Sequence, residues 1–163
     1  MSDYYVKNLA VLLPLEMASN IVDFALDAGR EAGLLPLTVA VLDTGGHLLA
    51  FKREDGCGIM RGDIAIGKAW GALGMGIASR TIRDRLADRP SFQSALAAAS
   101  QGRFVPVPGG VLVCNEEGYV IGAVGISGDA SDKDEYCSIT AIKKTGLISS
   151  PPVPSANWQK AGL

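Results

Sequence analysis

The sequence predicts a mixed α/β (α+β) domain in which helices cover both faces of an antiparallel sheet, a three-layer α-β-α sandwich. Two segments have the pattern of a β-hairpin, and helical periodicity occurs before, between and after them. A hairpin joins antiparallel neighbours, so two hairpins do not build the parallel sheet of a dinucleotide-binding fold. The 163 residues, 48% of them hydrophobic, are enough for one domain with a sizeable core.

The first helix and the first hairpin follow from local signals. A helix is predicted from about Pro14 to Ala32, because proline suits a first helical turn and Gly33 suits a C-cap. The strand Leu37–Asp43 is apolar on both alternating faces apart from one threonine, which favours a central place in the sheet. A glycine-rich turn then returns the chain into a partner strand, His47–Arg53.

The remaining elements complete one domain. Four further helices are predicted, at about 63–76, 80–87, 91–101 and 131–145. The second hairpin joins strands at 111–114 and 119–127. The last helix has Ser131 as its predicted N-cap, with Asp134 in the capping-box position. A single domain is therefore predicted over 1–163, with its core at about 14–148 and an irregular, proline-rich tail at 149–163.

Composition and charge limit the partners. The formal net charge is −2 and acids alternate with bases, so no basic stripe indicates a nucleic-acid partner. No segment has the roughly 20 apolar residues of a membrane span, and the apolar run Leu9–Leu15 is too short for a good signal peptide. The three cysteines, Cys57, Cys114 and Cys137, form no CxxC pair, which indicates reduced thiols and a cytoplasmic protein.

Three segments, in this order, carry a family resemblance: VAVLDTGGHLLAFKREDG, DIAIGKAWGA and PGGVLVCNEEGYVIGAVGISGDASDKDE. Together they resemble the GlcG/HbpS-like haem-binding family, which is also similar to the C-terminal domain of the propanediol-utilisation corrinoid adenosyltransferase. The match extends over residues 14–145 or so. It implies a profilin-like fold, assembly into homo-oligomers, and binding of haem, with slow haem degradation in some members.

The resemblance implies a cytoplasmic, oligomeric small-ligand-binding protein that takes haem or a related tetrapyrrole and is associated with catabolism of small organic acids or alcohols. An alternative from another class is a small enzyme, an isomerase, hydratase or lyase, that acts on an organic acid through a carboxylate general base. A purely structural or assembly role is a third reading. The sequence leaves open whether the protein is an enzyme.

His47 is the single histidine of the sequence, so it is a possible haem iron ligand. The alternative is a solvated polar residue, because His47 directly follows the Gly45–Gly46 turn. Other side chains able to ligate iron have no spacing that singles one out; they are Met60, Met75, Tyr119, Tyr136 and the three cysteines.

Two basic residues are candidates for ligand binding. Arg53 ends its strand on the face of Leu49 and Phe51, where its guanidinium could hold a carboxylate or a haem propionate through paired hydrogen bonds. A surface arginine paired with a neighbouring acid is the alternative. Lys68 lies among small and apolar residues, and is either an anion contact or a lysine that extends to the surface.

Glycines of the second hairpin form a further candidate site. Gly125 interrupts a strand of good β-formers, and glycine there often marks the close approach of another group. With Gly109, Gly110, Ser127 and Gly128 it could form an open pocket floor. Close packing of a helix explains the same glycines equally well. The helix at 63–76 carries its own stripe of small residues, which predicts one face against the sheet and another against a second subunit.

Acidic residues gather at the start of the last helix, where the helix dipole stabilises negative charge. One of them could act as a general base, beside backbone N–H groups that stabilise an oxyanion. Glu135 is the first choice, then Asp129 and Asp134, the latter having a capping task. Capping alone is the alternative, and the sequence contains no P-loop, zinc signature or Ser-His-Asp elbow.

Overall fold

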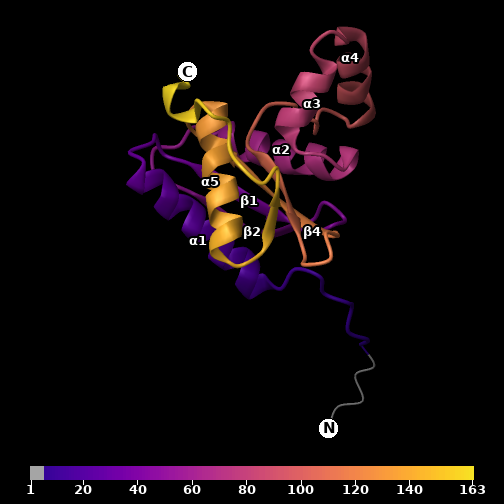
Figure 1. Ribbon diagram of the computed structural model, residues 1–163. Coiled ribbons are helices and arrows are strands. Elements are labelled where there is room, and N and C mark those ends of the chain that lie inside the picture. The colour runs from indigo at the N-terminus through magenta and orange to yellow at the C-terminus, as the bar shows by residue number, and fades with distance from the viewer. Residues whose placement is uncertain (1–5) are drawn as a thin grey trace.

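The protein is described by a computed structural model over residues 6–163, so residues 1–5 of the predicted domain lie outside the described part. The fold is a mixed α+β three-layer sandwich, as predicted, and its one sheet has a fifth strand beyond the two predicted hairpins (Figure 1). Its strands are β1 (Thr38–Leu42), β2 (Leu48–Arg53), β3 (Gly110–Cys114), β4 (Val120–Ser127) and β5 (Ile148–Ser150). The order is β2-β1-β4-β3-β5, and every neighbouring pair is antiparallel.

Helices cover both faces of the sheet. They are α1 (Leu15–Glu31), α2 (Arg61–Met75), α3 (Ser79–Leu86), α4 (Pro90–Ala99) and α5 (Ser131–Lys144), followed by a short 3-10 helix, η1 (Trp158–Lys160). Helices α1 and α5 pack on each other and on one face, and α2 packs on the other. Helices α3 and α4 extend beyond α2, away from the sheet (Figure 1).

The core has one apolar layer on each side of the sheet. On the side of α1 and α5, Val39 and Val41 of β1 pack with buried residues of both helices. On the side of α2, Leu42 packs with Ala69 and Ala72. Strand β1 is buried along its whole length, which confirms the central position predicted from its two apolar faces.

The small residues of α2 face the sheet. Ala65, Ala69 and Ala72 are 0% exposed. A Cβ atom at Gly125 would overlap the carbonyl oxygen of Ala65. The backbone of α2 therefore approaches β4 more closely than a residue with a side chain at position 125 would allow. The outer face of α2 is partly covered by residues 103–105 of the same chain.

Two local predictions are wrong. The N-cap of α5 is Ala130 and not Ser131, and no side chain caps the helix, because the Asp134 carboxylate reaches Lys68 and the backbone of Asp129 instead.

The segment 149–163 is not wholly irregular. Strand β5 pairs with β3, and the Trp158 ring of η1 stacks on Tyr136 of α5 at 3.7 Å. Three residues are too few to show strand periodicity.

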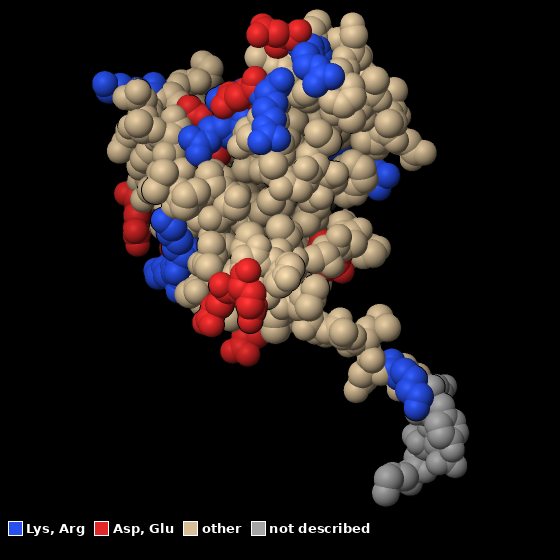
Figure 2. All heavy atoms as spheres, turned by 45° about the vertical axis from the view of Figure 1, so that its right-hand side comes forward, with Lys and Arg blue, Asp and Glu red and all other residues tan. Residues whose placement is uncertain are grey.

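The surface carries charges of both signs. On the face shown in Figure 2, lysine and arginine side chains lie beside aspartate and glutamate, around broad areas without charge. Within residues 6–163, no helix has the length and apolar character needed to cross a membrane.

Candidate functional site

His47 lies in the turn between β1 and β2. One oxygen of Asp43, Oδ1, accepts the backbone N–H groups of Gly45 at 2.9 Å and of His47 at 3.0 Å, and lies 3.2 Å from His47 Nδ1. The backbone hydrogen bond from His47 is the main cause that lowers the pKa of Asp43. The His47 side chain is 80% exposed. This geometry supports the reading of His47 as a solvated turn residue.

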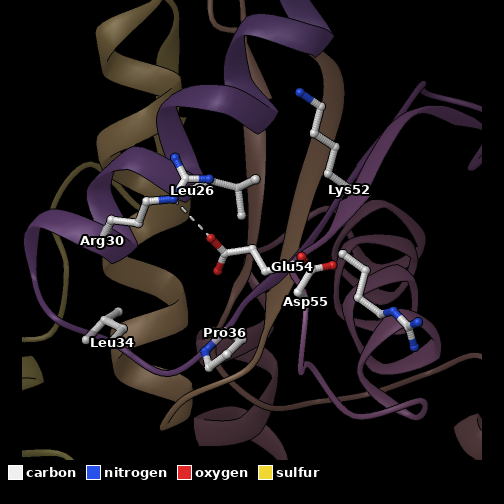
Figure 3. A pocket seen from close by; sticks show the side chains of 8 residues that line it. Leu26, Arg30, Leu34, Pro36, Lys52, Glu54 and Asp55 are labelled. Atoms are coloured by element: carbon white, nitrogen blue, oxygen red, sulfur yellow. Dashed lines mark hydrogen bonds and ion pairs between the residues drawn. The ribbon is translucent and has the colours of Figure 1, made fainter.

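A second candidate site is a basin of about 620 Å³ at the opposite end of the hairpin, where β2 ends (Figure 3). Helix α1, the segment after it and the end of β2 form its walls. The basin is lined by Leu26, Arg30, Leu34, Pro36, Lys52, Arg53, Glu54 and Asp55. One wall is apolar, while the rest carries three cations and two carboxylates.

Two of the three cations already have partners. Arg30 donates to Glu54 Oε1 at 3.2 Å and to Asp27 at 2.9 Å, and Lys52 donates to Asp23 at 2.6 Å. The other oxygen of Glu54, Oε2, accepts a backbone N–H at 2.7 Å, so both of its oxygens are engaged. These pairs hold α1 against the end of β2 and so fix the shape of the basin.

Arg53 is the third cation, and it has no ion-pair partner within residues 6–163. It is the last residue of β2 and lies opposite Thr38 of β1. Because side chains alternate along a strand, Arg53 projects to the face opposite that of Lys52. Its exposed side chain is therefore free to pair with an acidic ligand at the rim of the basin.

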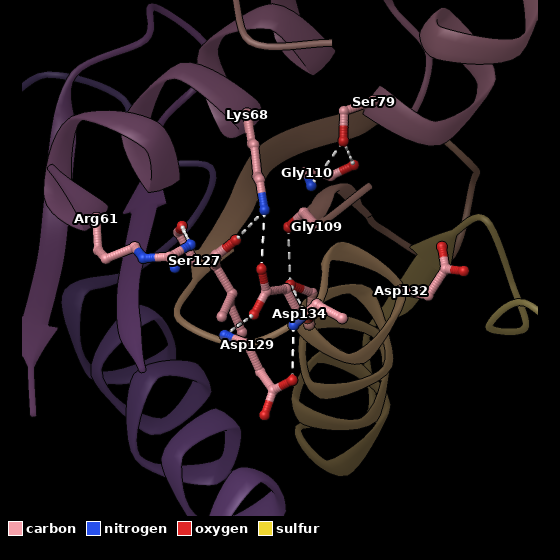
Figure 4. A network of polar contacts seen from close by, with 12 residues as sticks. Arg61, Lys68, Ser79, Gly109, Gly110, Ser127, Asp129, Asp132 and Asp134 are labelled. Carbon is pink, nitrogen blue, oxygen red and sulfur yellow. Dashed lines mark hydrogen bonds and ion pairs between the residues drawn. The ribbon is translucent and has the colours of Figure 1, made fainter. Parts of the chain in front are cut away.

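Lys68 lies in a buried polar network between the sheet and α5 (Figure 4). Its Nζ donates to the Ile126 carbonyl at 2.8 Å and to Asp134 Oδ2 at 2.9 Å, and both charged side chains are at most 2% exposed. Burial lowers the pKa of Lys68 and raises that of Asp134 to about 6, although the Lys68 charge opposes the second shift. Lys68 therefore joins α2 to β4 and α5, and does not extend to the surface.

Asp129 belongs to the same network. Its backbone N–H donates to Asp134 Oδ1 at 3.1 Å, and its carboxylate accepts the Leu35 N–H at 3.0 Å and Lys133 Nζ at 3.1 Å. Burial alone would raise the pKa of Asp129, but these donors and the Ala130 N–H outweigh burial and lower it. A carboxylate held by this many donors stays ionised and is a weak base.

The predicted pocket-floor glycines surround this network, and protein atoms fill the space above them. An added Cβ would meet Lys68 at Gly109 and Gly110, Ala65 at Gly125, and Pro36 at Gly128. Ser127 Oγ accepts a hydrogen bond from Arg61 at 3.3 Å. The sequence allowed either an open pocket floor or close packing of a helix at these glycines, and the geometry is that of close packing.

Glu135 points to the other side of α5, toward α3 and the C-terminal segment. It is 0% exposed, and its Oε1 forms an ion pair with Arg80 Nε at 3.1 Å. Burial raises the pKa of Glu135 to about 7; Arg80 and the backbone of Ser155 oppose the shift, and Asp132 adds to it. Arg80 also donates to the Val153 carbonyl at 3.0 Å.

The structure thus separates the predicted site residues into four places. Lys68, Asp129, Asp134 and the residues around them form the buried network, Glu135 lies on the far side of α5, Arg53 borders the basin, and His47 lies in the turn. The basin's other residues were not predicted. The run of Arg53, Glu54 and Asp55 at a strand end is the one sequence signal for it, because the α1 wall depends on tertiary packing.

Comparisons with known proteins agree with this fold. A model of the family described as "Haem degrading protein HbpS-like" matches residues 13–143. A 15.0 kDa protein in the dhaT-dhaS intergenic region of Citrobacter freundii is 32% identical over 108 residues, which is 66% of this chain and 75% of that protein.

Solved structures have the same architecture. The PduOC:heme complex has a TM-score of 0.76 at 24% identity, covering 85% of this chain and 98% of its own. Klebsiella pneumoniae ORFY has a TM-score of 0.75 at 25% identity, covering 87% and 95%. HbpS has a TM-score of 0.70 at 24% identity, covering 86% and 94%. The chain belongs to the HbpS-like family of haem-degrading proteins.

Proposed function

We propose that this protein binds haem or a related tetrapyrrole in the basin at the end of β2. The observation that carries the proposal is the pairing of an apolar wall, formed by Leu26, Leu34 and Pro36, with an unpartnered cation, Arg53, at the rim. The volume of about 620 Å³ falls within the range of small-molecule sites, which is about 300–1,000 Å³. The similar PduOC structure is a complex with haem.

The basin fits the organic part of such a ligand. A porphyrin is a flat apolar ring with two propionates at one edge, so its ring would lie against the apolar wall. A propionate would reach Arg53 around the end of β2, because this side chain projects to the face opposite the apolar wall; the planar guanidinium binds carboxylates through two hydrogen bonds. Lys52 lies next along β2 and is held by one exposed carboxylate, so it is the second candidate for a propionate. The basin's lining residues include no histidine, cysteine, methionine or tyrosine as an iron ligand.

The finer parts of the proposal have separate support. Free thiols at Cys57, Cys114 and Cys137 are consistent with action in the cytoplasm. Assembly into homo-oligomers is supported by the family, and an association with catabolism of small organic acids or alcohols rests on the resemblance. The relative in Citrobacter freundii is named for its place between dhaT and dhaS.

Titration of the purified protein with haem tests the proposal. We expect saturable binding at micromolar haem with a shifted Soret band. Replacing Arg53 by Gln should weaken binding about tenfold, because one charge-assisted hydrogen-bonded pair is lost. Arg85→Gln is the matched control, since Arg85 is an exposed arginine of α3 outside the basin. Absence of a Soret shift would remove the proposal.

A second candidate function, an enzyme of organic-acid metabolism, is supported at one residue. Glu135 has a pKa of about 7, the range in which a general base works near neutral pH, and Arg80 lies 3.1 Å from its Oε1. The pKa of Asp129 is lowered, and both oxygens of Asp134 are engaged, one with Lys68 and the other with the Asp129 N–H. A screen of small organic acids for turnover tests this function, and Glu135→Gln should then reduce turnover by about two to four orders of magnitude.

A further inference from the structure

The C-terminal strap, residues 151–160, follows β5 and lies beside the first turns of α5, where it contacts both α5 and α3 (Figure 1). We propose that this strap is a pH-sensitive cover over Glu135, which closes over the protonated carboxyl group and opens when that group is ionised. The proposal concerns the protein without a ligand. It goes beyond the proposed function and does not depend on it.

The strap is held to the domain by few contacts. None of its residues is buried. The Trp158 ring stacks on Tyr136 of α5 with the ring centroids 3.7 Å apart, and the Val153 carbonyl accepts a hydrogen bond from Arg80 of α3 at 3.0 Å. A segment with so few buried contacts opens locally at a low cost in free energy, while the rest of the domain stays folded. The strap can therefore open by itself.

Glu135 lies beneath the strap and is 0% exposed. Its Oε1 forms an ion pair with Arg80 Nε at 3.1 Å, and the backbone of Ser155, in the strap, also stabilises the carboxylate. Arg83 of α3 adds a weaker attraction, whereas Asp132 on the same helix repels the negative charge. These groups do not offset the cost of burying the charge, which raises the pKa of Glu135 to about 7.

Opening of the strap links the Glu135 carboxylate to water. Its pKa then moves back toward the ordinary 4.5. Because the closed form binds the proton more tightly than the open form, protonation favours closure and loss of the proton favours opening. The open fraction therefore rises as pH increases from about 4.5 to 7, and levels off above pH 7. Opening exposes Glu135 in the ionised form, which is the form that accepts a proton.

Fluorine NMR of the full-length protein labelled with 5-fluorotryptophan tests the proposal. The chain has two tryptophans, Trp70 and Trp158, so the variant Trp158→Phe assigns both signals. Between pH 5 and pH 8 we expect the ratio of open to closed strap, read from the Trp158 signal, to rise about tenfold or more. Glu135→Gln should keep the Trp158 signal in its low-pH state throughout, because a neutral amide has no proton to lose.

Two further variants complete the experiment. Glu117→Gln is the matched control, since Glu117 is an exposed acid in the turn between β3 and β4, and it should keep the wild-type profile. Arg80→Gln removes the ion pair with Glu135 and the hydrogen bond to Val153, so the strap should be more open than in the wild type at every pH. An Arg80→Gln profile identical to that of the wild type would contradict the contacts that hold the strap.

Two results would overturn the proposal. The first is a wild-type Trp158 signal that stays constant from pH 5 to pH 8. The second is a Glu135→Gln profile identical to that of the wild type, because the change would then belong to another titrating group, such as Asp134 in the buried network with Lys68.

Discussion

His47 and Arg53 lie at opposite ends of strand β2, about 20 Å apart by the rise of an extended strand. The sequence nominated the first as a haem iron ligand and the second as a propionate anchor. A ligand in the basin lies at the Arg53 end of the strand, and His47 is not among the basin's lining residues. The basin beside Arg53, at about 620 Å³, is larger than the hollow of about 140 Å³ between the His47 turn and Trp70, which is why the account places the ligand there.

Replacing His47 by Ala should leave haem binding unchanged and weaken the turn slightly. The imidazole is 80% exposed, and its contact with Asp43 is an exposed pair, worth about 0.2–1 kcal/mol of the free energy of unfolding. Haem titration and thermal unfolding of the same samples measure both effects. A Soret band that moves or disappears in His47→Ala would show that the turn histidine ligates the iron.

Breaking the buried pair of Lys68 and Asp134 should destabilise the fold strongly. Lys68→Met leaves a buried carboxylate without its cation, and we expect a loss of about 3–5 kcal/mol in denaturant unfolding. Lys68→Met with Asp134→Asn should recover a large part of this loss, because the amide keeps an acceptor for the Asp129 N–H without the charge.

The control for this pair is Lys52→Met, which breaks the exposed pair with Asp23 and should cost about 0.2–1 kcal/mol. Strictly additive effects of the Lys68 and Asp134 changes would contradict a coupled, buried pair.

Glu135 should make stability depend on pH. Its pKa in the folded protein, about 7, lies above the ordinary 4.5, so between these values the folded state holds more protons than the unfolded state. The free energy of unfolding therefore falls as pH rises from about 4.5 to 7, and levels off above pH 7. Glu135→Gln should remove a fall of the order of 2 kcal/mol, measured as the difference in unfolding free energy between pH 5 and pH 8.

Glu117→Gln serves as the control for this profile, because Glu117 is an exposed acid in the turn between β3 and β4. Asp134, with its pKa of about 6, also makes the free energy of unfolding fall as pH rises, in every variant that retains it. The effect of Glu135 is therefore the difference between the wild-type and Glu135→Gln profiles. A Glu135→Gln profile as steep as that of the wild type would show that Glu135 does not titrate near neutral pH.

Gly125→Ala should separate α2 from the sheet. The new methyl group would overlap the Ala65 carbonyl oxygen, so we expect a loss of about 1–3 kcal/mol or more. Gly74→Ala in the same helix meets only Trp70 at 3.9 Å and should stabilise the protein by up to about 1 kcal/mol, because alanine is the better helix former. Denaturant unfolding of the two variants measures the predicted loss of stability in Gly125→Ala and the predicted gain in Gly74→Ala. A neutral Gly125→Ala would contradict the close helix–sheet contact.

Local patterns in the sequence were enough for most of the fold. Pro14 and Gly33 bracket α1, and the turn glycines after Asp43 mark the first hairpin, because these signals act within a few residues. The burial of β1 followed from its two apolar faces. Strand β5 was missed because three residues, paired to β3, carry no period of their own.

The candidate sites were harder to predict, since they depend on contacts distant in sequence. Lys68 and Asp134 are 66 positions apart, and nothing near either one indicates that they form a buried pair. The basin joins Leu26 and Arg30 of α1 to the end of β2, so only Arg53 could be nominated from its own strand. Glu135 was preferred because Asp134 already had a capping task, whereas its full burial beside Arg80 arises from α3 and the C-terminal segment.

The location of the bound tetrapyrrole is tested most directly by amide chemical-shift mapping. Gallium protoporphyrin IX, a diamagnetic substitute for haem, would be added to the ¹⁵N-labelled protein. The account predicts the largest shifts at the amides of the basin, namely Leu26, Arg30, Leu34 and residues 52–55, with little change at the His47 turn. Shifts concentrated at the His47 turn, or around residues 129–135, with the basin amides unmoved, would contradict it.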